Sequence, residues 1–303
     1  VGPVTPKIHN KAPELTLESD QIGTWTNTPV AVSASADDGT GSGIAELCLA
    51  NVCDPTNPKT TTVDPGIGNV IERTFIASAT DAVGNLATAE PLTVRVDRAV
   101  PTVSVTPDTD AASNGPVVFT IEAGDEGSGL SNVCVVIDDS ACTTIVLDDN
   151  GEYTTAALDI VDGSGQITVT ANVADAAGNT GTATSTVSID NIAPVVSITP
   201  KSNSWSTTPV LITVAASDGE SGIETICLQR NAGNAEPLTL VNGSYSDTIT
   251  TEGLTALQVR VTDNVGNEST DNATVRVDTI APNVTITPND ALWRAGVVQV
   301  TLA

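Results

Sequence analysis

The sequence predicts an all-β protein built from tandem β-sandwiches of about seven antiparallel strands each, arranged as an extended array. Two observations support this prediction. Apolar and polar residues alternate with a period of two through most of the chain, as in half-buried strands, and no stretch has the period of an amphipathic helix. The same order of motifs also recurs about every 90 residues. Each copy closes on a proline, at Pro13, Pro101, Pro194 and Pro282.

Each copy is long enough to bury a hydrophobic core of its own. About seven strands in roughly ninety residues is typical of an Ig-like β-sandwich, and an up-and-down barrel is the less favoured alternative. We therefore expect a leader, three Ig-like repeats and the first strands of an incomplete fourth, with the ranges 1–11, 12–100, 101–193, 194–281 and 282–303.

The alternation within each repeat indicates its strands. A repeat opens with a short alternating segment such as PTVSVTP and closes with two alternating strands around a D-x-x-G-N turn. Trp25 and Trp205 each stand four residues before a proline, so we expect them in loops that close one end of a sandwich. In the closing strands of the third repeat, five apolar side chains are expected to face the core: Leu257, Val259, Val261, Val275 and Val277.

The chain is strongly acidic, and this limits its partners. It has 11 Lys plus Arg against 37 Asp plus Glu, for a formal net charge of -26. Such a charge repels nucleic acid and anionic lipid headgroups, so cations are the natural partners. No apolar run is long enough for direct membrane insertion. The chain starts with Val and contains no Met, which suggests a mature or excised piece of a longer polypeptide.

The cysteines follow one landmark, an S-G-[IL] tripeptide, at a constant offset. Their spacing predicts two hairpin disulfides, because residues that face each other across a hairpin lie within disulfide reach. The pairs are Cys48 with Cys53 and Cys134 with Cys142, and Cys227 keeps the offset but has no partner, so it is expected to be a free thiol. Reduced buried thiols are the alternative, and a zinc site is less favoured because no second ligand pair is present. Disulfides indicate an extracellular or cell-surface location.

Four motifs in fixed order, A-P-x-V-x-I-T-P, D-x-x-S-G-I, T-D-x-x-G-N-x-S and V-x-V-D-x-x-A-P, resemble tandem bacterial Ig-like domains that form the stalks of very large surface adhesins. The resemblance covers residues 12–303. It implies that calcium at the domain junctions stiffens the array. The hairpin cysteines depart from this pattern and suggest a lineage that relies partly on disulfides.

The recurring aspartates are the candidate calcium ligands. In a sandwich of this topology, the last Asp of one repeat lies near two loops of the next. Carboxylates that converge without a basic partner repel one another unless a cation lies among them, and calcium accepts such oxygen ligands. The expected first set is Asp97, Asp125, Glu126 and Asp175. The expected second set is Asp190, Asp218, Glu220 and Asp263.

Two features limit this metal hypothesis. The Asp of each D-x-x-G-N turn can act as a turn former alone, by capping backbone amides; these residues are Asp81, Asp175 and Asp263. In addition, His9 takes the place of the linker Asp at the entry to the first repeat. Because a neutral imidazole is a poor oxygen-donor substitute, we expect weak calcium binding or none at that position.

No catalytic arrangement is recognisable, so we expect that the chain is not an enzyme. His9 is the sole histidine, and there is no nucleophile elbow, His pair or phosphate-binding glycine loop before a helix. The favoured function is a structural stalk or spacer whose partners are neighbouring domains of the same polypeptide or like subunits. The alternative is a module that binds a glycan or protein receptor through variable hairpin loops, such as residues 54–69 and 147–166.

Overall fold

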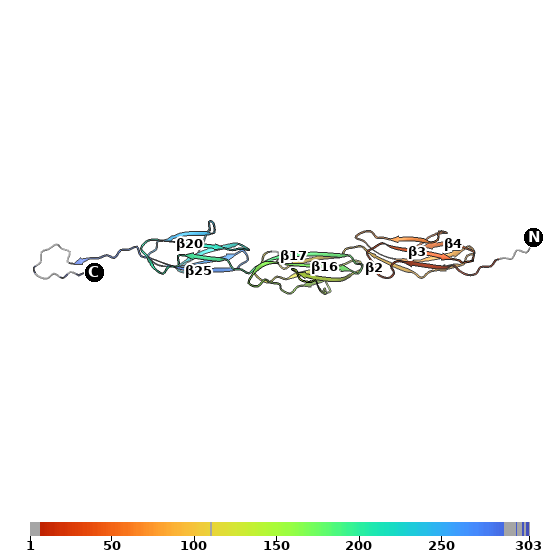
Figure 1. The fold of residues 1–303 in the computed structure, drawn as a ribbon, viewed down its shortest axis with the longest axis horizontal. Coiled ribbons are helices and arrows are strands. Elements are labelled where there is room, and N and C mark those ends of the chain that lie inside the picture. The colour runs from red at the N-terminus through yellow and green to blue at the C-terminus, as the bar shows by residue number, and fades with distance from the viewer. Residues whose placement is uncertain (1–6, 110, 288–294, 296–298, 300, 303) are drawn as a thin grey trace, which may run out of the picture. The chain divides into compact units, whose positions relative to one another are not determined.

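The computed structural model describes residues 7–109, 111–287, 295, 299 and 301–302, and these consist of strands, turns and irregular connections (Figure 1). Within them, no helix is long and apolar enough to cross a membrane. The described residues form two compact units. The first lies within 1–111, 116–159 and 166–187, and the second within 112–115, 160–165 and 188–303.

Residues 14–97 form three sheets, ordered β1-β3-β6, β2-β10-β7 and β5-β4-β8-β9. All pairings are antiparallel except that of β2 with β10. The strands are β1 (Glu14–Ser19), β2 (Trp25–Thr26), β3 (Val30–Asp37), β4 (Ile44–Leu49), β5 (Val52–Asp54), β6 (Lys59–Val63), β7 (Val70–Phe75), β8 (Ala77–Asp81), β9 (Leu86–Thr88) and β10 (Leu92–Asp97).

The core between these sheets follows from the alternation in the sequence. On β3, the inward side chains of Val30, Val32 and Ala34 are fully buried, while the residues between them are exposed or half-buried. They pack with apolar residues of β4, β6, β7, β8 and β10, among which Phe75 is also fully buried. Two layers of strands that share one apolar core form a β-sandwich.

Residues 102–190 form two sheets, ordered β11-β12-β15 and β14-β13-β16-β17. The long β16 and β17 carry the D-x-x-G-N turn between them. The strands are β11 (Thr102–Pro107), β12 (Phe119–Gly124), β13 (Leu130–Ile137), β14 (Thr143–Thr144), β15 (Glu152–Thr154), β16 (Ser164–Asp175) and β17 (Thr180–Asp190).

Residues 195–277 repeat this arrangement with the sheets β18-β20-β23 and β19-β25-β24-β21-β22. The five side chains expected in the core, on β24 and β25, are all buried there, which confirms the predicted closing pair. The strands are β18 (Val195–Thr199), β19 (Trp205–Ser206), β20 (Val210–Ser217), β21 (Ile223–Arg230), β22 (Ala235–Pro237), β23 (Ser244–Ile249), β24 (Gly253–Asp263) and β25 (Glu268–Val277).

The structure confirms an all-β chain of Ig-like sandwiches and corrects one detail. Trp25 and Trp205 were expected in loops, but each lies in a two-residue strand that pairs in parallel with the last strand of its segment. The pairing satisfies backbone groups that a loop would leave to water. Beyond residue 281, β26 (Ile286–Thr287) pairs with β27 (Thr301–Leu302); the rest of the expected incomplete fourth repeat lies largely outside the described residues.

Candidate metal centres at the linker carboxylates

The three D-x-x-G-N turns hold their aspartates in the same way. In each turn, one oxygen of the Asp carboxylate accepts the backbone N–H of the Asn four residues later, at 2.8 Å. The Gly before that Asn has φ between +94° and +97°, a region that favours glycine. Each Asp is almost fully buried at the end of β8, β16 or β24. The turns are Asp81–Asn85, Asp175–Asn179 and Asp263–Asn267.

The Asn side chain of each turn has a role that the sequence did not reveal. Its Nδ2 donates to the carboxylate of the turn Asp at 2.6 to 2.7 Å. It also donates to the backbone carbonyl of a linker residue: His9 at 3.2 Å, Asp97 at 3.0 Å or Asp190 at 2.8 Å. The Asn therefore fastens the linker to the turn. Its constant spacing of four residues from the Asp is the signal that could have identified it.

The first linker cluster consists of Asp97, Asp125 and Asp175. Each offers a carboxylate oxygen that lies within 4.8 Å of those of the other two. Asp97 ends β10 and is fully buried, and its Oδ2 accepts the backbone N–H of Ser128 at 2.6 Å. Ser128 belongs to the loop after β12, so this carboxylate joins the linker to that loop.

Asp125 supplies the most informative atom of the first linker cluster. Its Oδ2 accepts the backbone N–H groups of Gly127 at 3.0 Å and Gly129 at 2.7 Å. Its Oδ1 is buried and has no hydrogen-bond partner. None of the three aspartates forms an ion pair with any described Lys, Arg or His. The cluster thus combines uncompensated negative charge with an unsatisfied buried acceptor.

The second linker cluster, Asp190, Asp218 and Asp263, repeats this geometry with carboxylate oxygens within 4.8 Å of one another. Asp190 accepts the backbone N–H of Ser221 at 3.0 Å, and Asp218 accepts that of Gly222 at 2.7 Å. Burial raises the pKa of Asp190, but hydrogen bonds from Ser221 and the backbone of Ile192 outweigh it and lower the pKa below its usual value. Asp190 is therefore held as an anion.

Glu126 and Glu220, which were expected in the two ligand sets, are not part of either cluster. Both side chains are exposed, and neither belongs to the groups of ligand atoms that lie within 4.8 Å. In the first loop Asp125 turns inward to accept the amides of Gly127 and Gly129, and the adjacent Glu126 faces solvent; in the second loop Asp218 accepts the amide of Gly222, and Glu220, two residues after Asp218, faces solvent. The structure brings together three of the four expected carboxylates in each set.

The histidine cluster, His9, Asp38 and Asp81, occupies the corresponding place before the first repeat. His9 Nδ1 lies 3.0 Å from Asp81 Oδ2, and His9 Nε2 lies 3.7 Å from Asp38 Oδ1. Burial raises the pKa of Asp81, but hydrogen bonds from Asn85, His9 and Val83 outweigh this effect and lower the pKa below its usual value. The carboxylate is therefore ionised. An ionised carboxylate only accepts, so the Nδ1–H of His9 donates to Asp81.

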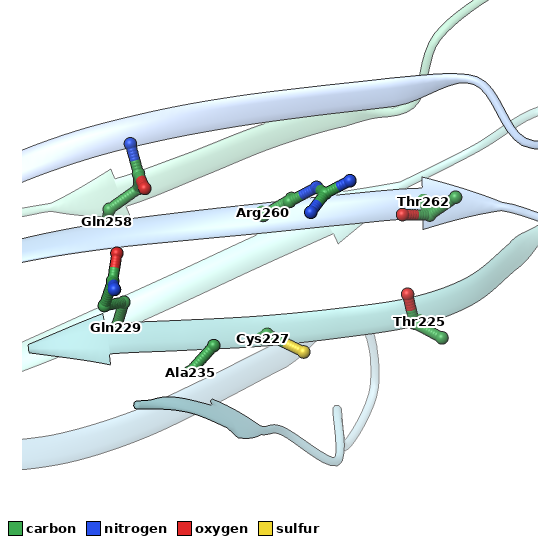
Figure 2. Close-up of a pocket in the computed structure, with 7 residues that line it drawn as sticks. All are labelled: Thr225, Cys227, Gln229, Ala235, Gln258, Arg260 and Thr262. Atoms are coloured by element: carbon green, nitrogen blue, oxygen red, sulfur yellow. The ribbon is translucent and has the colours of Figure 1, made fainter. Parts of the chain in front are cut away.

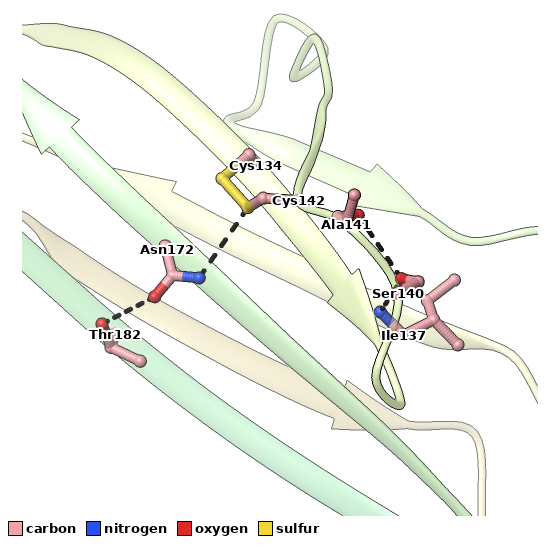
Figure 3. Close-up of a disulfide and its surroundings, with 7 residues drawn as sticks. All are labelled: Cys134, Ile137, Ser140, Ala141, Cys142, Asn172 and Thr182. Carbon is pink, nitrogen blue, oxygen red and sulfur yellow. Dashed lines mark hydrogen bonds between the residues drawn. A yellow bond between two sulfur atoms is a disulfide. The ribbon is translucent and has the colours of Figure 1, made fainter.

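The cysteines are placed as two disulfides and one free thiol. Cys48 pairs with Cys53 across the β4–β5 hairpin, and Cys134 with Cys142. Figure 3 shows Asn172 beside the second disulfide, with its Nδ2 3.9 Å from Cys142 Sγ. Cys48 and Cys53 lie near Glu46, but their bonded sulfurs are not thiolate ligands, which removes the zinc alternative there.

Cys227 is the free thiol and is half-buried on β21. Figure 2 shows it beside Ala235 of β22, with Arg260 on the neighbouring β24. These residues line a shallow hollow of about 400 Å³. The residue opposite Cys227 on β22 is Pro237, so no second sulfur stands across this pairing.

No protein-family model and no curated protein matches the sequence. Several solved structures resemble the chain. One is a tetra-tandem repeat from the extending region of a large adhesion protein, with 20% identity, a TM-score of 0.40 and coverage of 92% of this chain and 77% of that one. Another concerns host-surface retention of a 1.5-MDa bacterial ice-binding adhesin, with 16% identity, a TM-score of 0.36 and coverage of 89% and 100%.

A third similar structure contains fibronectin(III)-like modules of CbhA from Clostridium thermocellum, with 17% identity, a TM-score of 0.29 and coverage of 58% of this chain and 93% of that one. The adhesin repeats among them are the kind of domain that the repeated motifs resemble. All three TM-scores lie below 0.5, so these likenesses assign no function to this chain.

Proposed function

We propose that this chain is a structural spacer, a stalk segment of an extracellular or cell-surface protein, whose linkers bind calcium. Its domains follow the sequence repeats 12–100, 101–193 and 194–281. The observation that carries the proposal is the pair of linker clusters: in each, a linker Asp and two loop aspartates converge without a basic partner. A cation bound there links the loops to the linker, and this opposes bending at that point.

Charge and ligand chemistry favour calcium at these clusters. Two carboxylates that share a site repel each other strongly, and a third increases the repulsion. Calcium takes six to eight oxygen ligands in flexible geometry, and a carboxylate that already accepts a backbone N–H retains lone pairs for a metal. The unsatisfied Oδ1 of Asp125 supports the same assignment in the first linker cluster. Three carboxylates leave further coordination positions for water or backbone carbonyls.

The extracellular setting is supported by the cysteines. Two disulfides in a chain with five cysteines fit an oxidising compartment, since cytosolic thiols are kept reduced. The partners of a spacer are the neighbouring domains of the same polypeptide or like subunits. A net charge of -26 disfavours nucleic acid as a partner.

Calcium titration of the intact chain tests this function. We expect two equivalents of bound calcium by calorimetry, a higher melting temperature, and a larger maximum dimension by small-angle X-ray scattering. Magnesium should bind more weakly because it demands near-ideal octahedral geometry. Asp139→Asn, at an exposed position outside the clusters, is the matched charge control and should behave as wild type. Absence of a calcium-dependent change in melting overturns calcium binding, and a change in melting without a change in dimension overturns stiffening.

A further inference from the structure

A polar pocket of about 400 Å³ lies in the first repeat, away from the linker clusters. Its lining includes Asp54 of β5, Thr56 of the following turn, Lys59 and Thr61 of β6, and Arg73 of β7. These elements are edge strands of three different sheets: β5, β6 and β7 each end a sheet order. The pocket is therefore built where the edges of the sheets converge, and its volume suits a small ligand.

Lys59 is an unusual residue for such a pocket because only 8% of it is exposed. Its Nζ lies 2.6 Å from Asp54 Oδ2. The hydrogen bond from Lys59 is the main reason that the pKa of Asp54 is lowered to about 2. The two charges therefore neutralise and orient each other, so this ion pair adds no net negative charge to the pocket.

Arg73 supplies the unneutralised charge. Its guanidinium lies 4.9 Å from the centroid of the buried Phe75 ring, so one face of the guanidinium is occupied. Its N–H groups form no ion pair with any described carboxylate. The other described arginines differ, because each pairs with a carboxylate or with Asn203; they are Arg95, Arg98, Arg230, Arg260 and Arg276. The net charge of -26 repels anions at long range, but the exposed guanidinium of Arg73 has donors free to contact a carboxylate directly.

We propose that this pocket binds an acidic saccharide through the carboxylate of a uronic or sialic acid unit. The planar fork of Arg73 matches a carboxylate. Threonine hydroxyls and the fixed Asp54 carboxylate offer donors and acceptors for sugar hydroxyls. Val52 and Pro58 add an apolar wall for the C–H face of a sugar ring. This function goes beyond the spacer role, is independent of calcium, and gives the variable segment at residues 54–69 a specific ligand.

The test uses the full chain in ¹⁵N–¹H NMR titrations with methyl β-D-glucuronide, methyl α-N-acetylneuraminide, methyl β-D-glucoside and acetate. At least one acidic sugar should produce saturable shifts in residues 52–61 and 73, and neither the neutral glucoside nor acetate should match its affinity. Arg73→Gln keeps the aliphatic stem over Phe75 and should weaken binding about tenfold, the scale of one charge-assisted hydrogen-bond pair.

Arg95→Gln is the matched control, because Arg95 lies on the adjacent β10 and is paired with Glu72. It should bind as wild type does. Lack of saturable shifts with both acidic sugars overturns the proposal, as does wild-type affinity in Arg73→Gln. Equal affinity for acetate overturns the saccharide assignment and leaves a carboxylate site. Equal melting temperatures of the two variants show that any loss is not a folding defect.

Discussion

The histidine cluster and the first linker cluster share one scaffold but carry different charges. In both, the Asn of a D-x-x-G-N turn donates to the backbone carbonyl of the linker residue, His9 or Asp97. In both, a loop aspartate accepts the amide of an S-G glycine at 2.7 Å. The linker side chain is the difference: an imidazole lies between two carboxylates in one cluster, and a third carboxylate joins them in the other.

From this difference we predict that the linker side chain sets calcium binding at each cluster. The imidazole of His9 donates a hydrogen bond to Asp81, and its Nε2 lies 3.7 Å from Asp38 Oδ1, so a hydrogen-bond donor takes the place that a third carboxylate has in the first linker cluster. The carboxylate of Asp97 cannot donate a hydrogen bond to Asp125 or Asp175, and its negative charge adds to their mutual repulsion. The second linker cluster has Asp190 in the place of Asp97, so it too brings three carboxylates together.

The largest expected effect is the loss of both calcium sites when the two linker aspartates are removed together. Asp97→Ala combined with Asp190→Ala should reduce bound calcium from two equivalents to none in calorimetry. At calcium 100-fold above the dissociation constant, each lost site removes about 2.7 kcal/mol of calcium-dependent stability. The control replaces the exposed Asp139 and Asp149 with Ala. A double linker variant that still binds two equivalents would show that the linker aspartates are not ligands.

A gain of one site is the next effect in size and tests the comparison in the opposite direction. His9→Asp gives the histidine cluster the same three carboxylates as the other two, so calorimetry should find a third calcium equivalent. The added calcium-dependent stability should be about 2.7 kcal/mol under the same conditions. His9→Asn, which introduces no charge, should leave the count at two. If His9→Asp also binds only two equivalents of calcium, the identity of the linker residue does not decide binding.

A smaller effect is expected from crowding one carboxylate. A Cβ at Gly127 would lie 2.2 Å from Asp97 Oδ2, so Gly127→Ala should displace this oxygen. We expect one of the two sites to weaken about tenfold, or about 1.4 kcal/mol. Glu220 occupies the corresponding position, immediately before the serine of the S-G pair. Because it is exposed and outside the second linker cluster, Glu220→Ala should leave affinity unchanged; weaker binding would identify Glu220 as a ligand.

The sandwich architecture was predictable because the burial of strands leaves a period of two in the sequence. The alternation on β3 and on β24 identifies inward residues such as Val32 and Val259 directly. The short parallel strands β2 and β19 were not predictable. A two-residue strand has no measurable period, and its pairing depends on where the chain is already held by neighbouring strands.

The candidate site was predictable only in part. The convergence of Asp97 with two loops of the next repeat follows from strand order, since strand ends at one edge of a sandwich lie close together. The contribution of Asn179 was missed, because an Asn in a D-x-x-G-N turn can be explained by turn geometry alone. Glu126 lies outside the cluster, since its neighbour Asp125 turns inward to accept two amides, and the sequence does not show which of the two side chains does so.

The smallest effect concerns acid and isolates the part of the comparison that needs no metal. Hydrogen bonds from Asn85, His9 and Val83 outweigh burial and lower the pKa of Asp81 in the folded protein. A depressed pKa contributes stability that is present above the ordinary Asp value of about 4 and is lost as the pH falls towards the folded value.

Urea unfolding of the wild type in the presence of a calcium chelator should therefore show stability that declines from pH 6 to pH 3. Asp81→Asn should be less stable at pH 6 but should decline less, whereas the exposed-site control Asp139→Asn should follow the wild type. Identical pH dependence in Asp81→Asn and wild type would show that the Asp81 carboxylate, although bonded to His9 at 3.0 Å, does not contribute its charge to stability.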